Sequence, residues 1–318
     1  MKRAAALLAA LTILRLVICA TTPLAPDEAY YWIWSQALAP GYLDHPPMVA
    51  VWIWIGTSIA GPTALGVRLL GPLAAALGTW MLADAAERLL PGRRAGLAAG
   101  ALLNATLFMT VGSVVMTPDS PLIFFWTATL WALVRLLGSG RAGWWWAVGG
   151  FAGLALLSKY TALLLWGGIG LWLMITPSVR GWLWRPVPWL AGLFGLLLFA
   201  PVVAWNLSHG WAGFLRQGGR VGEWQVGRAA QYLGELIGSQ FGLATPGVWA
   251  LCLAGIALAV RQSWKGRDPG WTLLACLTVP AALVFLQHAT GDRVQGNWPA
   301  IIYPAAVIAA TGLVGALW

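Results

Sequence analysis

The sequence predicts an all-α polytopic membrane protein with about ten transmembrane helices and interfacial helices in its first extramembrane loop. Hydrophobic residues occupy 59% of the 318 positions, and the mean hydropathy is +0.74. Only 9% of the residues are charged, which is far below the share found in soluble domains. A chain of this length accommodates roughly ten spans of about 20 residues with their connections.

We expect a single transmembrane domain over residues 1–318, with the first periplasmic loop carrying the site, and no soluble C-terminal domain. The N-terminal Met-Lys-Arg before an apolar run is similar to a secretory signal peptide. Arg15 interrupts that run, however, and no A-x-A cleavage site precedes Pro23, so we expect a retained first span. The three cysteines fall in apolar runs without metal-ligand spacing, which indicates buried small side chains.

The apolar runs define the expected elements in chain order. Lys2 and Arg3 keep the start of the first span in the cytoplasm, so the first loop, about 23–63, is periplasmic. The stretch 26–47 in that loop is expected to form a helix that starts at Pro26 and lies on the bilayer. The run 48–60 is too short to cross a bilayer and fits an interfacial or re-entrant helix. The expected spans are 4–22, 64–89, 95–114, 121–137, two within 144–175 that break near 158–160, 187–205, 243–260, 271–287 and one that opens at 297.

The distribution of basic residues supports this topology. Twelve Lys and Arg side chains fall on the cytoplasmic side, six do not, and Arg15 lies within a span. Three of the six exceptions lie in the long polar loop expected over 206–240, where the positive-inside rule weakens. This distribution of basic residues accounts for the net charge of +9 and indicates a multi-pass protein of a bacterial inner membrane with cytoplasmic termini. It does not indicate a nucleic-acid-binding protein.

The first loop concentrates ionisable side chains. Residues 26–47 hold three of the ten carboxylates and one of the three histidines. Asp27 and Glu28 suit the positive end of a helix that opens at Pro26, so both could be simple helix-start residues. We instead expect Asp27 to be catalytic and Glu28 to bind substrate. Three further side chains of this loop are substrate-binding candidates: Tyr30, Asp44 and His45.

Seven of the ten carboxylates are expected on the periplasmic side, so any chemistry should take place there. The chain has no Walker loop, H-E-x-x-H, G-x-S-x-G or dinucleotide fingerprint. Activated groups must therefore arrive by another route, and polyprenyl-phosphate sugars are donors that a membrane enzyme meets at the periplasmic leaflet. Displacement of the lipid phosphate needs a carboxylate for the acceptor proton and cations for the departing phosphate.

Further candidates lie outside the first loop. Asp119 stands between two prolines and could cap the next helix, but we expect it to be a second catalytic acid. Lys159 interrupts the apolar segment 144–175 and could extend from a span end to water. An ionisable group in such a segment is nevertheless a functional candidate, and we expect Lys159 to bind an anionic partner, the donor phosphate. The remaining substrate-binding candidates are Tyr160, Arg216 and Arg220, and both arginines could equally be solvated loop residues.

Five motifs run through the chain: Asp27-Glu28-x-Tyr30-Tyr31, Tyr42 to Pro47, Thr117-Pro118-Asp119, Ser158-Lys159-Tyr160 and Asn297-Trp298-Pro299. Together they resemble glycosyltransferase family 39, membrane enzymes of the GT-C class that include protein O-mannosyltransferases and aminoarabinose lipid A transferases. The resemblance implies inverting sugar transfer from a polyprenyl-phosphate donor to a lipid, glycan or protein acceptor. It also implies that Asp27 is the central acid, Asp119 a second acid of the same site and Lys159 a phosphate-facing cation.

The first loop departs from that pattern at two positions. His45 follows Asp44 where the aminoarabinose transferases carry a lysine, and Tyr30 lies where they carry an arginine. The donor sugar and the acceptor therefore stay open, as does a divalent metal at the acidic site; no cofactor is required. A lipid or sugar transporter or flippase is the alternative class. We favour the enzyme, since no internal repeat is seen and the acids lie on one side instead of at the midplane.

Overall fold

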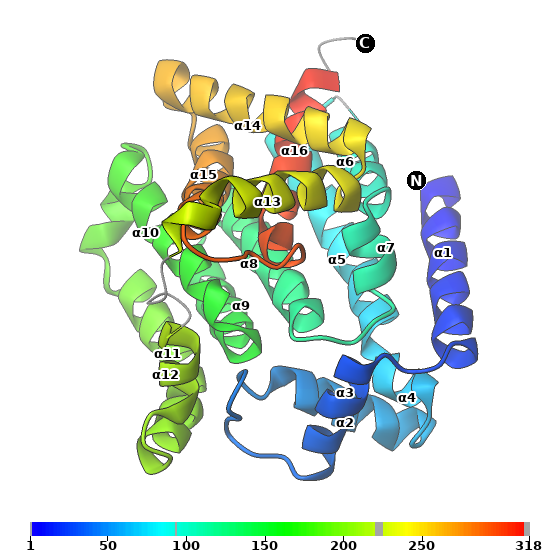
Figure 1. The fold of residues 1–318 in the computed structure, drawn as a ribbon. Helices are drawn as coiled ribbons and strands as arrows, with labels where there is room; N and C mark the ends of the chain where they lie inside the picture. Colours follow the sequence, from blue (N-terminus) through cyan, green and yellow to red (C-terminus); the bar gives the residue numbers. More distant parts are fainter. Residues whose placement is uncertain (1, 93, 220–224, 315–318) are drawn as a thin grey trace.

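The structure is a computed structural model that describes residues 2–92, 94–219 and 225–314 (Figure 1). These residues form helices and connections without any strand, which confirms the all-α fold class. Six helical segments are long and apolar enough to cross a membrane. They are α1 (Lys2–Thr21), α4 with α5 (Ala64–Arg68 and Leu70–Leu89), α8 (Asp119–Ser139), α11 (Pro186–Ser208), α14 (Pro246–Gly266) and α15 (Pro269–His288).

The other expected spans are shorter helices. The third expected span is broken into two, because Thr106 ends the first helix and caps the second by accepting a hydrogen bond from Met109 N at 3.1 Å. The expected break in the segment 144–175 is confirmed, since a 3₁₀ turn (Tyr160–Ala162) separates its two helices. The shorter apolar helices are α6 (Ala95–Asn104), α7 (Leu107–Gly112), α9 (Trp144–Ser158), α10 (Leu163–Ile175) and the 3₁₀ turn η4 with α16 (Trp298–Ile302 and Tyr303–Val314). The number of ten spans stays a prediction.

Two interfacial helices follow α1 as expected, α2 (Pro26–Gln36) and α3 (Met48–Ala60). Figure 1 shows them with α4 at one end of the bundle, below the C-terminal end of α1. The start of α2 at Pro26 and the bounds of α3, which ends at Gly61 with φ +74°, match the sequence prediction, whereas the end of α2 at Gln36 was not predicted.

The expectation of an irregular loop over 206–240 is wrong for most of that range. Two helices lie there, α12 (Ala212–Gly219) and α13 (Ala229–Leu243). In α13 the buried side chains are Tyr232, Leu236 and Gln240, which recur every four residues and form one helical stripe. The glycines between them obscured this period in the sequence.

The first helix is attached to the bundle by few contacts, and Figure 1 shows it at the edge. Arg15 on α1 is 2% exposed, and its Nη2 donates to the side-chain oxygen of Asn104 at 3.0 Å. Asn104 in turn donates to Thr79 Oγ1 at 3.0 Å. This polar chain joins α1 to α6 and α5 inside an otherwise apolar contact, where such bonds stabilise helix association.

The tightest helix contact joins α9 and α11. A Cβ at Gly149 would lie 2.0 Å from the carbonyl oxygen of Ala191, and one at Gly153 would lie 2.6 Å from that of Gly195. Both glycines are therefore required for the close approach of the two backbones, as in other small-residue helix contacts in membranes. This contact fixes the orientation of α9 and therefore the position of Lys159, which follows the last residue of the helix.

Replacing Gly149 tests this contact. Gly149→Val should lower the midpoint of thermal unfolding in detergent, because overpacking costs about 1–3 kcal/mol or more when backbone must move. Gly170→Val on α10 is the matched control, because no atom lies within 4 Å of its added Cβ. Equal midpoints for the two variants would contradict the packing.

Candidate active site

Asp27 lies in the first turn of α2 and is exposed to solvent. No described residue forms a hydrogen bond or an ion pair with its carboxylate. A carboxylate in the first turn of a helix interacts favourably with the helix dipole. Asp27 is therefore free to accept a proton from a bound molecule.

The neighbouring carboxylate, Glu28, is fully buried. Its Oε1 accepts from Arg68 Nε at 2.7 Å and from Met116 N at 2.9 Å, and its Oε2 accepts from Ala25 N at 2.8 Å. Arg68 Nη2 also pairs with Oε2. Every side of this carboxylate is thus occupied by protein, so the expected substrate-binding role of Glu28 is corrected to a structural one.

Arg68 extends this network to the first helix. Its Nη1 donates to the carbonyl oxygen of Thr22 at 2.9 Å and to the Thr22 hydroxyl at 2.7 Å, while its Nη2 donates to the carbonyl oxygen of Pro23 at 2.8 Å. The pair therefore joins the end of α1, the start of α2, α4 and the segment before α8. It sets the position of Asp27 without engaging it.

Asp119 and Lys159 form a second buried ion pair. Lys159 Nζ lies 2.8 Å from Asp119 Oδ1 and 3.0 Å from Oδ2, and the two residues are only 6% and 8% exposed. Asp119 opens α8 and Lys159 follows the last residue of α9. Lys159 has an anionic partner, as a buried ammonium requires, but that partner is Asp119, whereas the sequence analysis expected the donor phosphate.

Two residues of the Asn297-Trp298-Pro299 motif complete this cluster. Asn297 Nδ2 donates to Asp119 Oδ2 at 2.6 Å. Lys159 Nζ lies 5.8 Å from the centre of the Trp298 ring, within the range of a cation–π contact. The pair thus joins α8, α9 and the turn before α16, three segments far apart in the sequence.

The loop between α2 and α3 is held in place from both sides. Tyr30 donates from its hydroxyl to Asp44 Oδ2 at 2.9 Å, and Gln217 Nε2 donates to the Asp44 carbonyl oxygen at 2.6 Å. Arg216 Nε lies 3.5 Å from Asp44 Oδ1, and its side chain is 57% exposed. Three of the expected substrate-binding residues, Tyr30, Asp44 and Arg216, are therefore brought together by α2, this loop and α12.

Tyr31 is a buried residue whose pKa is affected by three of the candidate acids. Burial raises the pKa of the Tyr31 hydroxyl, and the negative charges of Asp27, Asp119 and Asp44 raise it further. Three acids predicted from separate motifs therefore act on one phenol, which stays neutral at physiological pH. His45 lies beside them, with its ring centre 6.2 Å from that of Tyr31.

The remaining candidates have less specific positions. The ring of Tyr160 packs edge-on against Phe214 at 5.5 Å and Phe199 at 6.2 Å, so it links the 3₁₀ turn after Lys159 to α11 and α12. Arg220 lies outside the described residues. In the part of the chain that the structure describes, no group of three or more His, Cys, Asp or Glu side chains could hold a metal ion. The divalent metal that the sequence left open therefore has no such centre among the described residues.

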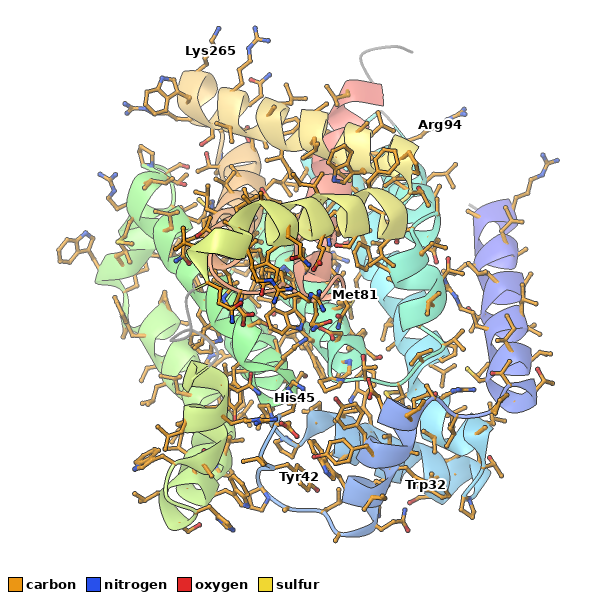
Figure 2. The ribbon with its side chains drawn as sticks, viewed as in Figure 1. Trp32, Tyr42, His45, Met81, Arg94 and Lys265 are labelled. Atoms are coloured by element: carbon orange, nitrogen blue, oxygen red, sulfur yellow. The ribbon has the colours of Figure 1, made fainter. Side chains whose placement is uncertain are left out.

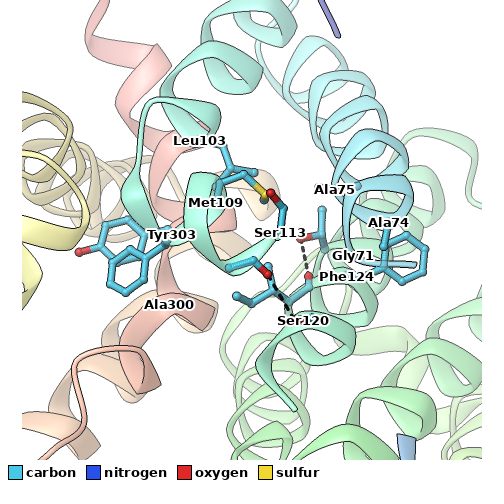
Figure 3. A pocket seen from close by; sticks show the side chains of 15 residues that line it. Gly71, Ala74, Ala75, Leu103, Met109, Ser113, Ser120, Phe124, Ala300 and Tyr303 are labelled. Carbon is cyan, nitrogen blue, oxygen red and sulfur yellow. Dashed lines mark hydrogen bonds between the residues drawn. The ribbon is translucent and has the colours of Figure 1, made fainter. Parts of the chain in front are cut away.

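Two hollows lie near this region, but neither contains the acids. A cavity of about 40 Å³, shown in Figure 3, lies between α5, α7, α8 and the start of α16, with Gly71, Met109 and Tyr303 among its lining residues. A shallow groove of about 490 Å³ lies between α2 and α3, beside Gln36 and Trp54. The candidate site is therefore defined by its charged groups and not by either hollow.

Sequence reasoning missed Arg68, Tyr31 and Asn297 as residues of this region. Arg68 did carry a signal, because it was one of six basic residues on the side where positive charge is disfavoured. Asn297 was noted only as part of a motif, since nothing in the sequence places it next to Asp119. His288 was also missed, although its ring lies 5.9 Å from that of Trp298.

Comparison with solved structures defines the fold class. The chain superimposes on ArnT from Cupriavidus metallidurans bound to undecaprenyl phosphate with a TM-score of 0.76 at 18% identity, over 96% of this chain and 59% of that one. It also matches the apo oligosaccharyltransferase of Archaeoglobus fulgidus with a TM-score of 0.64 at 12% identity, over 98% of this chain and 50% of that one. The arrangement of helices is therefore that of the GT-C membrane glycosyltransferases.

Comparison of the sequence with family models identifies the family to which the chain belongs. Residues 44–205, half of the chain, match the family model described as dolichyl-phosphate-mannose-protein mannosyltransferase, and the chain belongs to this family. It is also 29% identical over 294 residues to the lipid A galacturonosyltransferase RgtD of Rhizobium johnstonii, which covers 92% of this chain and 61% of that protein. The chain thus spans about three fifths of the length of RgtD and of ArnT.

The Glu28–Arg68 pair should be required for stability. Glu28→Gln leaves a buried guanidinium without its counter-charge, a loss that typically costs about 3–5 kcal/mol. The measurement is the thermal unfolding midpoint of the purified protein in detergent. Asp27→Asn, one residue away and exposed, is the matched control and should unfold like the wild type; a wild-type midpoint for Glu28→Gln would show that the pair is not structural.

Proposed function

We propose that the protein is a membrane glycosyltransferase that moves a sugar from a polyprenyl-phosphate donor to a lipid, glycan or protein acceptor with inversion at the anomeric carbon. The observation that carries this proposal is the buried Lys159 ammonium held by Asp119, together with an exposed acid, Asp27, whose charge raises the pKa of Tyr31 as those of Asp119 and Asp44 do. Membership of the mannosyltransferase family supports the reaction class, and the ArnT structure with bound undecaprenyl phosphate supports the donor class.

In this proposal Asp27 is the general base. Among Asp27, Asp44 and Asp119, it is the one acid that lacks a partner among the described residues, and its carboxylate is exposed. Asp27 accepts the proton of the acceptor hydroxyl as the acceptor oxygen bonds to the anomeric carbon. The bond from that carbon to the phosphate oxygen breaks, and its electron pair leaves with the polyprenyl phosphate.

Lys159 stabilises the departing phosphate, and Asp119 has a different role from Asp27. Asp119 already accepts from both the Lys159 ammonium and the Asn297 amide, so its oxygens are engaged by protein groups, whereas those of Asp27 are not. Asp119 is therefore the counter-ion that holds Lys159 in place before the donor arrives. The donor phosphate exchanges with Asp119 as the partner of the ammonium. Arg216 and Tyr30, which flank Asp44, contact the donor or the acceptor.

The site would lie on the periplasmic face of a bacterial inner membrane, with the donor entering from the outer leaflet. The excess of basic side chains at the other end of the bundle supports this orientation. Figure 2 shows Arg94 and Lys265 at that end, and Trp32, Tyr42 and His45 at the end that holds α2.

Removing the base tests the proposed reaction. Asp27→Asn keeps the shape of the side chain and should lower transfer by about 10²–10⁴-fold while the protein still folds. The assay is sugar transfer from a panel of polyprenyl-phosphate sugars by purified protein in liposomes. Asp268→Asn at the opposite end of the bundle is the control, and turnover at the wild-type rate in Asp27→Asn would show that Asp27 is only a helix-start residue.

Variants of the Asp119–Lys159 pair distinguish a structural role of Lys159 from a role in phosphate binding. Lys159→Met alone should lower stability, because it leaves the Asp119 carboxylate buried without a counter-charge. Asp119→Asn combined with Lys159→Met should recover most of that stability, as double-mutant cycles show for coupled groups. Binding of undecaprenyl phosphate, measured by native mass spectrometry, should be weak in both variants that lack Lys159; wild-type binding by either would refute the phosphate role.

Orientation can be measured separately from activity. A reporter fused after Trp34 should read periplasmic, and one fused after Gly92 should read cytoplasmic, because the two positions lie at opposite ends of the bundle. The measurement is the activity of paired alkaline phosphatase and fluorescent-protein fusions. The reverse pattern would place the acids in the cytoplasm and remove the site from the leaflet in which the donor is proposed.

A further inference from the structure

A cluster of arginine and tryptophan side chains lies at the end of the bundle opposite the acids. It is formed by the C-terminal parts of α5 and α8 and the start of α9, and its members are Trp80, Asp84, Arg88, Trp131, Arg135 and Trp144. Arg135 follows Asp119 by 16 residues on one continuous helix, a separation of about 24 Å. The cluster therefore belongs to the other face of the membrane from the proposed active site.

One carboxylate oxygen holds the cluster together. Asp84 Oδ2 accepts from Trp131 Nε1 at 2.8 Å and from Arg88 Nε at 2.9 Å, and Arg135 Nε lies 2.9 Å from the same oxygen. Arg135 is also fixed by aromatic rings, since its guanidinium carbon lies 5.2 Å from the centre of the Trp131 ring and 5.9 Å from that of Trp144. These contacts hold both arginines in defined positions.

The cluster has more positive than negative charge. Two guanidinium groups share one carboxylate, and the terminal nitrogens of Arg88 and Arg135 have no acceptor among the described residues. The next carboxylate on α5, Glu87, accepts from Gly96 N at 3.1 Å and so is engaged by the start of α6. The free guanidinium nitrogens are arranged as donors for an anion with several oxygens.

An apolar stripe leads to these donors along the outer face of α5. Leu73, Leu77 and Trp80 are 44%, 45% and 50% exposed, and their spacing of four and three residues places them on one side of the helix. The same side continues through Asp84 and Arg88, each four residues further on. A hydrocarbon chain lying on the two leucines would therefore end at the guanidinium groups, with a tryptophan at the level of the interface.

From this combination we propose that the cluster is a binding site for the phosphate of an anionic phospholipid, with an acyl chain of that lipid along Leu73 and Leu77. The excess of positive charge in the cluster favours binding of the anionic phosphate, and the apolar stripe on α5 favours a lipid over a free anion. Basic side chains between membrane helices recognise anionic headgroups in this way on the cytoplasmic side. The site is separate from the proposed transfer reaction and does not depend on it.

The test measures retention of a defined lipid by the delipidated, full-length protein. Purified wild type in detergent is mixed with phosphatidylglycerol or phosphatidylcholine, and the lipid-bound fraction is read by native mass spectrometry. We expect a preference for phosphatidylglycerol that falls about fivefold in Arg88→Gln and in Arg135→Gln, the effect of one basic side chain near an anionic surface. Arg88→Gln should fold normally, because its side chain is 42% exposed.

Arg261→Gln is the matched control, since Arg261 is exposed near the C-terminal end of α14, at the same end of the bundle, but outside the cluster. It should bind phosphatidylglycerol like the wild type. Wild-type retention in both cluster variants would overturn the proposal, and so would an equal loss in Arg261→Gln. Full displacement of the bound lipid by an equimolar amount of inorganic phosphate would overturn the assignment to a lipid.

Discussion

The buried ion pair of Asp119 and Lys159 is the interaction on which the arrangement of the site depends. Each charge would be costly in an apolar bundle without the other, so the two must meet. Their contact joins the start of α8 to the end of α9, and Asn297 adds the turn before α16. Any anion that binds Lys159 must therefore compete with a contact that the fold already needs, so donor binding in the proposed reaction would be an exchange of partners.

A second buried ion pair joins Glu28 and Arg68, and it distinguishes the engaged carboxylate of Glu28 from the unengaged carboxylate of Asp27. Glu28 has all of its acceptor capacity engaged and is inaccessible, whereas Asp27 is exposed and unengaged although it is adjacent in sequence. The helix start thus has two functions: one carboxylate anchors α2 to α1 and α4, and the other faces outward. In the proposed reaction, this division would leave the proton acceptor unengaged on a helix that is fixed in position.

Much of the fold could be predicted from the sequence, because apolar length, proline and glycine act locally. Pro26 predicted the start of α2, Gly61 predicted the end of α3, and the polar Ser158-Lys159 step predicted the break between α9 and α10. The helices within 206–240 could not be predicted, since their apolar period is interrupted by glycine. The motif acids Asp27, Asp44 and Asp119 were found, but which acid is paired and which is free depends on contacts between distant segments, such as Arg68 with Glu28.

The two ends of the bundle differ in charge. The charges of Asp27, Asp44 and Asp119 act on Tyr31 at one end, and at the other Arg88 and Arg135 share the single carboxylate of Asp84. A structure of this protein with undecaprenyl phosphate bound tests the central claim most directly. The exchange model predicts a phosphate oxygen within hydrogen-bond distance of Lys159 Nζ and a lengthened or broken contact to Asp119; a phosphate bound elsewhere, with the pair still about 3 Å apart as in other charge-assisted bonds, would contradict it.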